Sequence, residues 1–216
     1  LTDYDNLRRW LVGWRIFAYL CSHYTNIRMT DTLPYNDYGT WVRRTFPYRV
    51  QKISVDAGFT CPNRDGRLSY GGCTFCDNTT FNPAYCHVGK TVTQQLEEGK
   101  AFFGRKYTSM KYLAYFQAFS NTYAPLDRLR ALYEEALAVD DVVGMVVGTR
   151  PDCIDREKMA YFSSLSRQCH VVVEFGIEST YDATLHRVNR GHTFAQSRAA
   201  VDMAHDAGVL CGGHVI

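Results

Sequence analysis

Apolar residues along the chain form short continuous runs that alternate with stretches of helical periodicity. The runs contain many Val, Ile and aromatic residues, and they show little of the apolar–polar alternation of a half-exposed strand. This pattern predicts strands that are buried on both faces of a parallel sheet. The runs cover residues 50–57, 111–119, 141–149, 170–179 and 208–216.

The segments between these runs carry helix signals. Pro125 stands before residues 126–137, whose apolar positions form one stripe at helical spacing. Thr91, Asp155 and Thr193 are each placed to cap a further helix. A strand and its helix recur about every 30 residues, which is the size of one βα unit.

Repeated βα units form either an open doubly wound sheet or a barrel. No glycine-rich dinucleotide fingerprint follows the first predicted strand, so we favour an α/β fold with a partial (β/α) TIM-like barrel of parallel strands. The last run ends at Ile216 with no helix after it. We therefore expect a barrel that is incomplete at its C-terminus, in a chain that is a truncated piece of a larger protein.

The beginning of the chain differs from the rest. We expect residues 1–30 to be an N-terminal extension that is not native or is disordered, and residues 31–216 to form the barrel. The apolar run 10–21 is too short to span a bilayer, and Arg15 interrupts it. The net charge of +2 gives no global electrostatic case for nucleic acid or acidic lipid. We predict no membrane association.

The eight cysteines do not form a disulfide scaffold, because four of them crowd into residues 61–86 and the rest are scattered. We infer a reducing compartment and predict a cytoplasmic protein. Three of the crowded cysteines, Cys61, Cys73 and Cys76, lie in the loop after the first predicted strand. Their spacing leaves a zinc site, an iron–sulfur cluster and plain thiols or disulfides open as interpretations.

The metal interpretations differ in the number of ligands. A structural zinc ion takes four ligands, and Cys86 or His87 could supply the fourth. A [4Fe–4S] cluster held by three thiolates keeps one iron open for a ligand. A zinc ribbon usually forms a small module of its own, whereas this loop grows out of a predicted barrel strand. Gly71 and Gly72 also allow a bulky cofactor close to the backbone, which favours the cluster.

The sequence around the loop contains further ordered motifs. DAGFTCPNRDG and GGCTFC are followed by YFQAFSNTYAP, GTRPDC, VEFGIES and NRGHT. Together they resemble the radical S-adenosylmethionine (SAM) superfamily, in particular YhcC-like proteins, which are relatives of the Elongator catalytic subunit and MiaB-type enzymes. The resemblance covers about residues 35–216. It implies that Cys61, Cys73 and Cys76 hold a [4Fe–4S] cluster, which cleaves SAM reductively and generates a 5′-deoxyadenosyl radical.

The resemblance also implies which residues contact SAM. Phe75 corresponds to an aromatic residue near the adenine, and Gln117, Ser120 or Asn121 lies where relatives receive the amino group. Glu178 corresponds to a residue that faces the ribose hydroxyls, because a carboxylate can accept two hydrogen bonds. Arg190 corresponds to an arginine that pairs with the SAM carboxylate. No residue is predicted to be catalytic beyond the cofactors.

Five other polar residues have less definite predictions. Arg150 and Asp152 either face the pocket or pair with each other. Glu174 lies within an apolar run, so it should have a charged partner or face the barrel lumen. His192 and His214 are expected to be structural.

Partners and the competing function follow from the same resemblance. An electron donor such as a flavodoxin or ferredoxin is implied, and the substrate is left open. RNA stays open as a partner but is not indicated, because the arginines are scattered rather than gathered with aromatic residues. The alternative is a zinc-stabilised binding module without catalysis, in which Cys86 or His87 joins the three cysteines.

Overall fold

The computed structural model describes residues 35, 37–77, 82–104 and 109–216. The chain separates after Trp41 into two compact units. In the first unit, Asp37 accepts a 2.8 Å hydrogen bond from the amide of Thr40, near the start of α2 (Tyr38–Thr45). The predicted extension of residues 1–30, including the apolar run 10–21, lies outside the described residues. Its boundary therefore stays a prediction.

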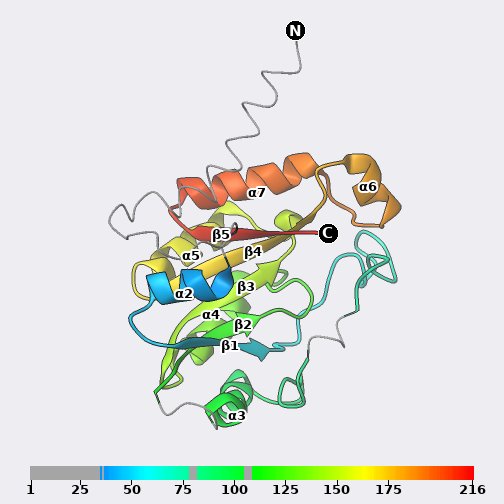
Figure 1. The fold of residues 1–216 in the computed structure, drawn as a ribbon. Helices are drawn as coiled ribbons and strands as arrows, with labels where there is room; N and C mark the ends of the chain where they lie inside the picture. The colour runs from blue at the N-terminus through cyan, green and yellow to red at the C-terminus, as the bar shows by residue number, and fades with distance from the viewer. Residues whose placement is uncertain (1–34, 36, 78–81, 105–108) are drawn as a thin grey trace. The chain divides into compact units, whose positions relative to one another are not determined.

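Five parallel strands form one sheet, in the order β1-β2-β3-β4-β5 (Figure 1). A doubly wound sheet reverses its strand order at a switch point, and this sheet does not. The predicted α/β fold with a partial barrel is confirmed, and every strand lies inside its predicted run. The strands are β1 (Val50–Val55), β2 (Lys111–Phe116), β3 (Val142–Thr149), β4 (His170–Glu178) and β5 (Leu210–Val215).

Helices connect successive strands, and the predicted caps are confirmed. Thr91 and Gln94 exchange the two hydrogen bonds of a capping box. The side chain of Asp155 accepts a 2.9 Å bond from the amide of Lys158, and Thr193 forms a capping box of its own. The helices of this unit are α3 (Val92–Gly104), α4 (Leu126–Leu137), α5 (Arg156–Ser166), α6 (Asp182–Arg187) and α7 (Phe194–Asp206), with a 3₁₀ turn η2 (Pro151–Cys153). None of the described helices is long and apolar enough to cross a membrane.

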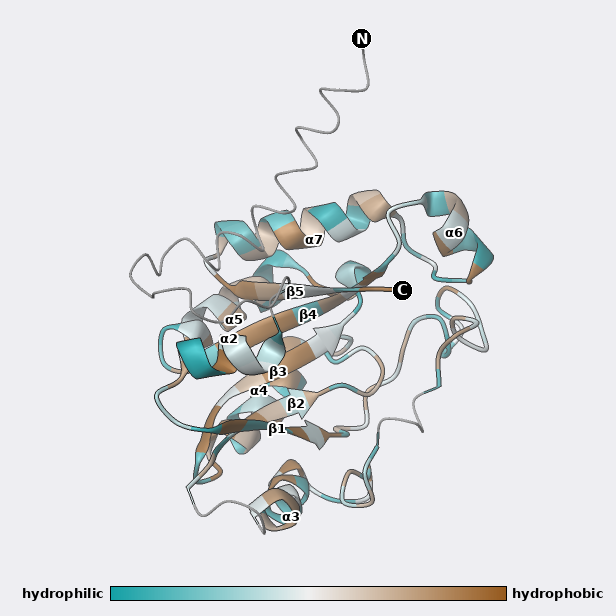
Figure 2. Ribbon diagram, viewed as in Figure 1, coloured by the Kyte–Doolittle hydropathy of each residue, from teal (hydrophilic) through white to brown (hydrophobic). Residues whose placement is uncertain are grey.

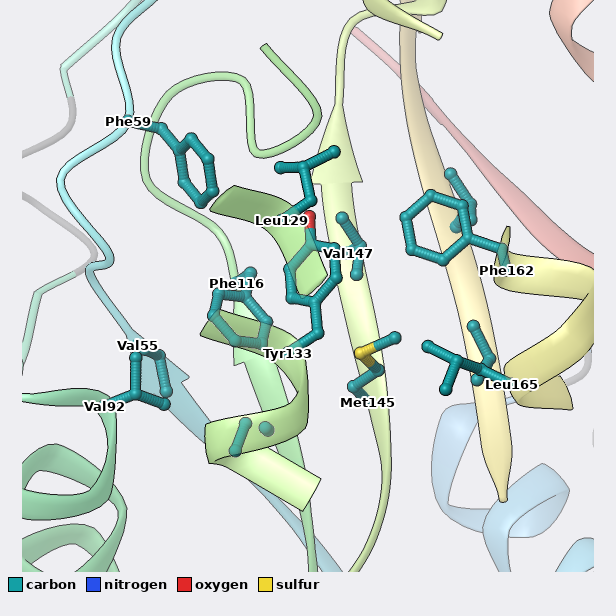
Figure 3. Packing of buried hydrophobic residues seen from close by; sticks show 14 of the residues in the cluster. Val55, Phe59, Val92, Phe116, Leu129, Tyr133, Met145, Val147, Phe162 and Leu165 are labelled. Atoms are coloured by element: carbon teal, nitrogen blue, oxygen red, sulfur yellow. The ribbon is translucent and has the colours of Figure 1, made fainter. Parts of the chain in front are cut away.

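One face of the sheet packs against the helices and forms the core. Tyr133 of α4 lies between the strands and α5, with its ring 4.9 Å from Phe116 and 5.7 Å from Phe162 (Figure 3). Val55 of β1 packs beside Val92 of α3 in the same layer. Strand β4 is largely apolar, whereas α7 alternates between polar and apolar positions (Figure 2). Buried strands and amphipathic helices have these two patterns.

The opposite face of the sheet carries polar side chains. Because side chains alternate along a strand, Lys52 and Glu174 point away from their buried neighbours Ile53 and Val173. The two form a 2.8 Å ion pair, although β2 and β3 separate their strands. His214 of β5 lies 3.1 Å from the second carboxylate oxygen. Glu174 therefore has the charged partners that its position in the sequence predicted.

Candidate functional site

The three predicted metal ligands border one cavity at the carboxyl ends of the strands. The cavity has a volume of about 440 Å³. A hollow of similar volume, about 420 Å³, lies between α4 and α5 and contains none of the predicted site residues. Besides Cys61, Cys73 and Cys76, the cavity at the strand ends is lined by four of the predicted SAM contacts, Phe75, Gln117, Glu178 and Arg190.

The cysteine loop, residues 61–76, folds back on itself through its own backbone. The carbonyl of Cys61 accepts bonds of 2.8 and 3.1 Å from the amides of Arg64 and Asp65. The amide of Cys76 donates to the carbonyl of Cys73 at 3.0 Å. Gly71 and Gly72 have φ values of +82° and +83°, a left-handed conformation that favours glycine. The glycine pair thus gives the loop a left-handed turn just before Cys73.

A second segment, residues 188–192, holds the cysteine loop from outside. The amide nitrogen of the Asn189 side chain donates to the carbonyl of Gly72 at 2.9 Å and to the hydroxyl of Ser69 at 3.1 Å. The backbone amide of Thr74 donates to the carbonyl of Val188 at 3.1 Å. Asn189 adopts φ = +53°, a conformation that Asn tolerates better than most residues. The loop is therefore fixed by residues that lie more than 100 positions later in the chain.

Nitrogen donors surround the buried sulfur of Cys73. Nη1 of Arg190 lies 3.5 Å and Nδ2 of Asn63 lies 3.6 Å from Sγ, both within hydrogen-bonding reach of a sulfur acceptor. Near Cys61, burial raises the pKa of the thiol, while the backbone amide of Asn63 and the charge of Arg150 act to lower it. Donors aimed at sulfur favour a thiolate, which is the form that binds metal. The residues present thus fit a thiolate-held cluster.

Two glycines form part of the cavity wall. Gly148 at the end of β3 and Gly176 at the end of β4 both line the cavity. A Cβ atom added at Gly176 would lie 2.3 Å from Nη2 of Arg190 and 2.6 Å from Oε1 of Glu178. The absence of a side chain at this position is therefore needed for Arg190 and Glu178 to take their places beside it.

Glu178 and Arg190, which were predicted to contact different parts of SAM, contact each other. Nη2 of Arg190 lies 3.3 Å from Oε1 of Glu178. Burial raises the pKa of Glu178, and the charge of Arg190 acts in the opposite direction. Glu178 has φ = +66° and follows a shift in the β4–β5 register after Gly176. Such irregularities re-aim a side chain and cluster at functional sites.

Asn121 does not line the cavity, unlike Gln117. Its side chain is fully buried and donates to the carbonyls of Phe116 at 3.0 Å and Gly148 at 2.7 Å. These bonds satisfy the ends of β2 and β3, so a structural role accounts for this residue. Ser120 is also buried, with its hydroxyl 3.1 Å from that of Thr149. Of the three candidates, Gln117 alone lines the cavity.

Arg150 and Asp152 pair with each other, which was one of the two predicted arrangements. Nε and Nη2 of Arg150 each lie 2.8 Å from a carboxylate oxygen of Asp152. Arg150 also donates to the carbonyl of Arg190 at 2.7 Å and lines the cavity. His192 accepts a 2.9 Å bond from Nε of Arg190, and burial together with that cation lowers its pKa to about 4. It is therefore a neutral acceptor, in keeping with the structural role expected for it.

Cys86 and His87 lie apart from the three cysteines. Cys86 is buried in the helix-side core near Tyr85, and burial raises the pKa of its thiol to about 11. His87 is exposed, and its Nδ1 accepts a bond from the amide of Gly89. Neither lines the cavity. No three His, Cys, Asp or Glu side chains in the described ranges converge closely enough to hold a single metal ion.

Comparison with known proteins settles the family. The family described as the Radical SAM superfamily matches residues 61–216, which begin at the first cysteine of the loop. The chain belongs to the radical SAM superfamily. It is 36% identical to "Protein YhcC" of Escherichia coli (strain K12) and 35% identical to "Uncharacterized protein YtqA" of Bacillus subtilis (strain 168). Each alignment covers 84% of this chain, and the chain spans 58% and 56% of the two relatives.

A solved structure supports the radical SAM fold. The apo, selenomethionine-labelled form of the cobalamin-dependent S-adenosylmethionine radical enzyme OxsB superimposes with a TM-score of 0.51. The superposition covers 82% of this chain and 25% of that one, at 16% sequence identity. At this identity the likeness concerns the fold of the radical SAM domain alone.

Two residues of the candidate site were missed in the sequence analysis. Asn63 and Arg64 lie inside the cysteine loop, and both contact cysteines, Asn63 at the sulfur of Cys73 and Arg64 at the carbonyl of Cys76. Their place between the first two cysteines was a signal that could have identified them. Their partners could not be read from the sequence, because they depend on how the loop closes.

Proposed function

We propose that this chain carries a [4Fe–4S] cluster on Cys61, Cys73 and Cys76 and works as a radical SAM enzyme. The observation that carries the proposal is that the three cysteines line one cavity, with Nη1 of Arg190 3.5 Å from the buried sulfur of Cys73. When bound, the cluster and SAM supply the chemistry, in which reductive cleavage of SAM yields a 5′-deoxyadenosyl radical. The protein binds, orients and shields these groups.

The cavity walls offer complementary surfaces for the parts of SAM. Phe75 is 41% exposed and lines the cavity, so its ring would give an aromatic face for the adenine. Glu178 has carboxylate oxygens that can accept hydrogen bonds from ribose hydroxyls. Gln117 follows β2 and lines the cavity, and its side chain would bind the amino group. These assignments rest on the proposed function and give each residue a separable role.

The polar face below the strand ends provides further groups for a substrate. Tyr115, Glu174 and His214 line the same cavity as the cysteines. A flavodoxin-like or ferredoxin-like protein would deliver the electron. The chain spans little more than half the length of the two relatives. The activity, substrate and partners of the whole protein are therefore proposed and not shown.

The test is metal analysis after anaerobic reconstitution of the chain, Cys73→Ala and Cys86→Ala. We expect about four irons and four sulfides per chain in the unmodified protein and in Cys86→Ala, and loss of both in Cys73→Ala. Adding SAM should change the electron paramagnetic resonance (EPR) spectrum of the reduced cluster. One zinc without sulfide, lost in Cys86→Ala, would instead support the zinc-stabilised module and refute the proposal.

A further inference from the structure

Each cysteine of the loop has an arginine near it. Arg64 donates to the carbonyl of Cys76 at 2.9 Å, and the charge of Arg150 acts on Cys61. The third arginine, Arg190, makes a buried contact of this kind, with its Nη1 3.5 Å from the buried sulfur of Cys73 and the residue only 8% exposed. Arg190 belongs to the segment after α6, whereas Arg64 belongs to the cysteine loop itself.

Other contacts fix the direction of the Arg190 guanidinium. Nη2 donates to the carbonyl of Gly176 at 2.7 Å and lies near Glu178, while Nε donates to Nε2 of His192. These contacts leave Nη1 aimed at Sγ of Cys73, 3.5 Å away. The residue as a whole is only 8% exposed, so water competes little for this bond. The guanidinium fork is thus held in one orientation relative to the sulfur.

We propose that Arg190 is a positioning residue that donates a charge-assisted N–H···S hydrogen bond to Cys73 and thereby raises the reduction potential of the cluster. The inference rests on the proposed function, which places the cluster on this thiolate. Reduction adds negative charge to the cluster, and a cation with a donor at the sulfur stabilises that added charge. Hydrogen bonds to the sulfurs and net charge are among the factors that set the potentials of such clusters.

Asn63 ties the cysteine loop to the backbone that carries Arg190. Its Nδ2 donates to the carbonyls of Asn189 at 2.5 Å and Arg190 at 2.8 Å, and it lies 3.6 Å from the sulfur of Cys73. Asn63 is fully buried, and its Oδ1 has no hydrogen-bond partner among the described residues. Because an amide nitrogen carries two hydrogens, the two carbonyls are its main acceptors. Asn63 therefore fixes the backbone of Arg190 next to Cys73.

The role proposed here differs from that implied by family resemblance, in which Arg190 pairs with the SAM carboxylate. A contact with SAM changes SAM affinity and leaves the SAM-free cluster unaltered. A hydrogen bond to Cys73 changes the midpoint potential before SAM is added. The potential of the SAM-free cluster therefore separates the two roles.

The experiment is an EPR-monitored redox titration of the reconstituted full chain without SAM. The variants are Arg190→Gln, Arg190→Lys and, as a control for loss of charge elsewhere, Arg130→Gln. Arg130 lies over the ring of Tyr161, away from the loop. We expect a more negative midpoint in Arg190→Gln, a smaller negative shift in Arg190→Lys, which keeps the charge but not the fork, and no shift in Arg130→Gln. Thermal unfolding and iron content establish that the compared variants are folded and loaded.

The possible results all decide the question. An unchanged midpoint in Arg190→Gln, with weaker SAM binding, would overturn the inference and leave the proposed function standing. If Arg190→Gln does not retain the cluster, its midpoint potential cannot be measured. An unchanged midpoint potential in Arg190→Lys then overturns the inference. Failure of the unmodified chain to bind iron and sulfide would overturn both the inference and the proposed function.

Discussion

The ammonium group of Lys52 on β1 lies 2.8 Å from the carboxylate of Glu174 on β4, across two intervening strands. In a flat sheet these strands would be about 14 Å apart, since neighbouring strands are spaced by about 4.8 Å. The ion pair therefore indicates a sheet that curves toward its polar face, as in a barrel. Glu174 and His214 line the same cavity as the three cysteines, so this charged cluster borders the candidate site.

The ion pair predicts a specific acid sensitivity. Burial acts to raise the pKa of Glu174, but hydrogen bonds from His214 and the charge of Lys52 outweigh it and lower the pKa to about 2. A lowered pKa means that the stabilisation is present above the ordinary glutamate range and is lost as the pH falls toward 2. We expect Glu174→Gln to remove about 1–3 kcal/mol of this pH-dependent free energy of unfolding, measured by urea unfolding between pH 2.5 and 6.

The matched control for this experiment is Glu97→Gln. Glu97 pairs with Lys100 at the surface, with its side chain 53% exposed. Its loss should leave the pH profile unchanged, because exposed pairs contribute little. A Glu174→Gln profile parallel to that of the unmodified protein would contradict the prediction.

Asn189 offers a test of how the cysteine loop is held. Asn189→Gly keeps the left-handed backbone but removes the hydrogen bonds to Gly72 and Ser69, at a cost of about 1–2 kcal/mol. Asn189→Ala also strains the backbone, by about 1 kcal/mol more. We expect the rate of cluster loss to a chelator to rise from the unmodified protein to the glycine variant and again to the alanine variant. Equal rates in the unmodified protein and Asn189→Gly would show that these bonds do not hold the loop.

Gly176 tests the wall of the cavity. A Cβ atom there would overlap Arg190 and Glu178, so Gly176→Ala must displace their side chains. We expect a destabilisation of about 1–3 kcal/mol in urea unfolding and a weakened hold on the cluster. Gly212→Ala on β5 is the control, because its Cβ atom would meet only Cγ of Glu174, at 3.4 Å. Similar iron retention in both variants would argue that the positions of Arg190 and Glu178 beside Gly176 do not matter for holding the cluster.

Phe75 tests the proposed adenine contact. If its exposed ring stacks on the base, Phe75→Ala should weaken SAM binding by about 1–3 kcal/mol, as stacking of bases on aromatic residues does. Titration calorimetry of the reconstituted protein with SAM measures this loss. Tyr70→Ala is the control, since Tyr70 lies in the same loop, is 79% exposed and does not line the cavity. Equal SAM affinity in the two variants would remove Phe75 from the binding site.

Local patterns made most of the fold predictable. The central strands β2 and β3 bury consecutive residues, which produces the continuous apolar runs, and helix caps depend on residues only three positions apart. For the site, the sequence predicted which residues take part but not which of them contact each other. The contact of Arg190 with the sulfur of Cys73 joins residues 117 positions apart, and nothing in either local sequence specifies it. The burial of Asn121 likewise depends on which strand-end carbonyls require a donor.

The contacts between the cysteine loop and residues 188–192 also have a consequence for biosynthesis. The hydrogen bonds join residues 114 to 127 positions apart, so the loop cannot close when the cysteines leave the ribosome. At about 5–20 residues per second, the later partners follow roughly 6–25 s afterwards. During that interval the thiols are unprotected and open to oxidation or to capture by other metals. Cofactor insertion is therefore expected late, after β4 and α6 have folded, and oxidative stress during translation should harm this protein more than the same stress after folding.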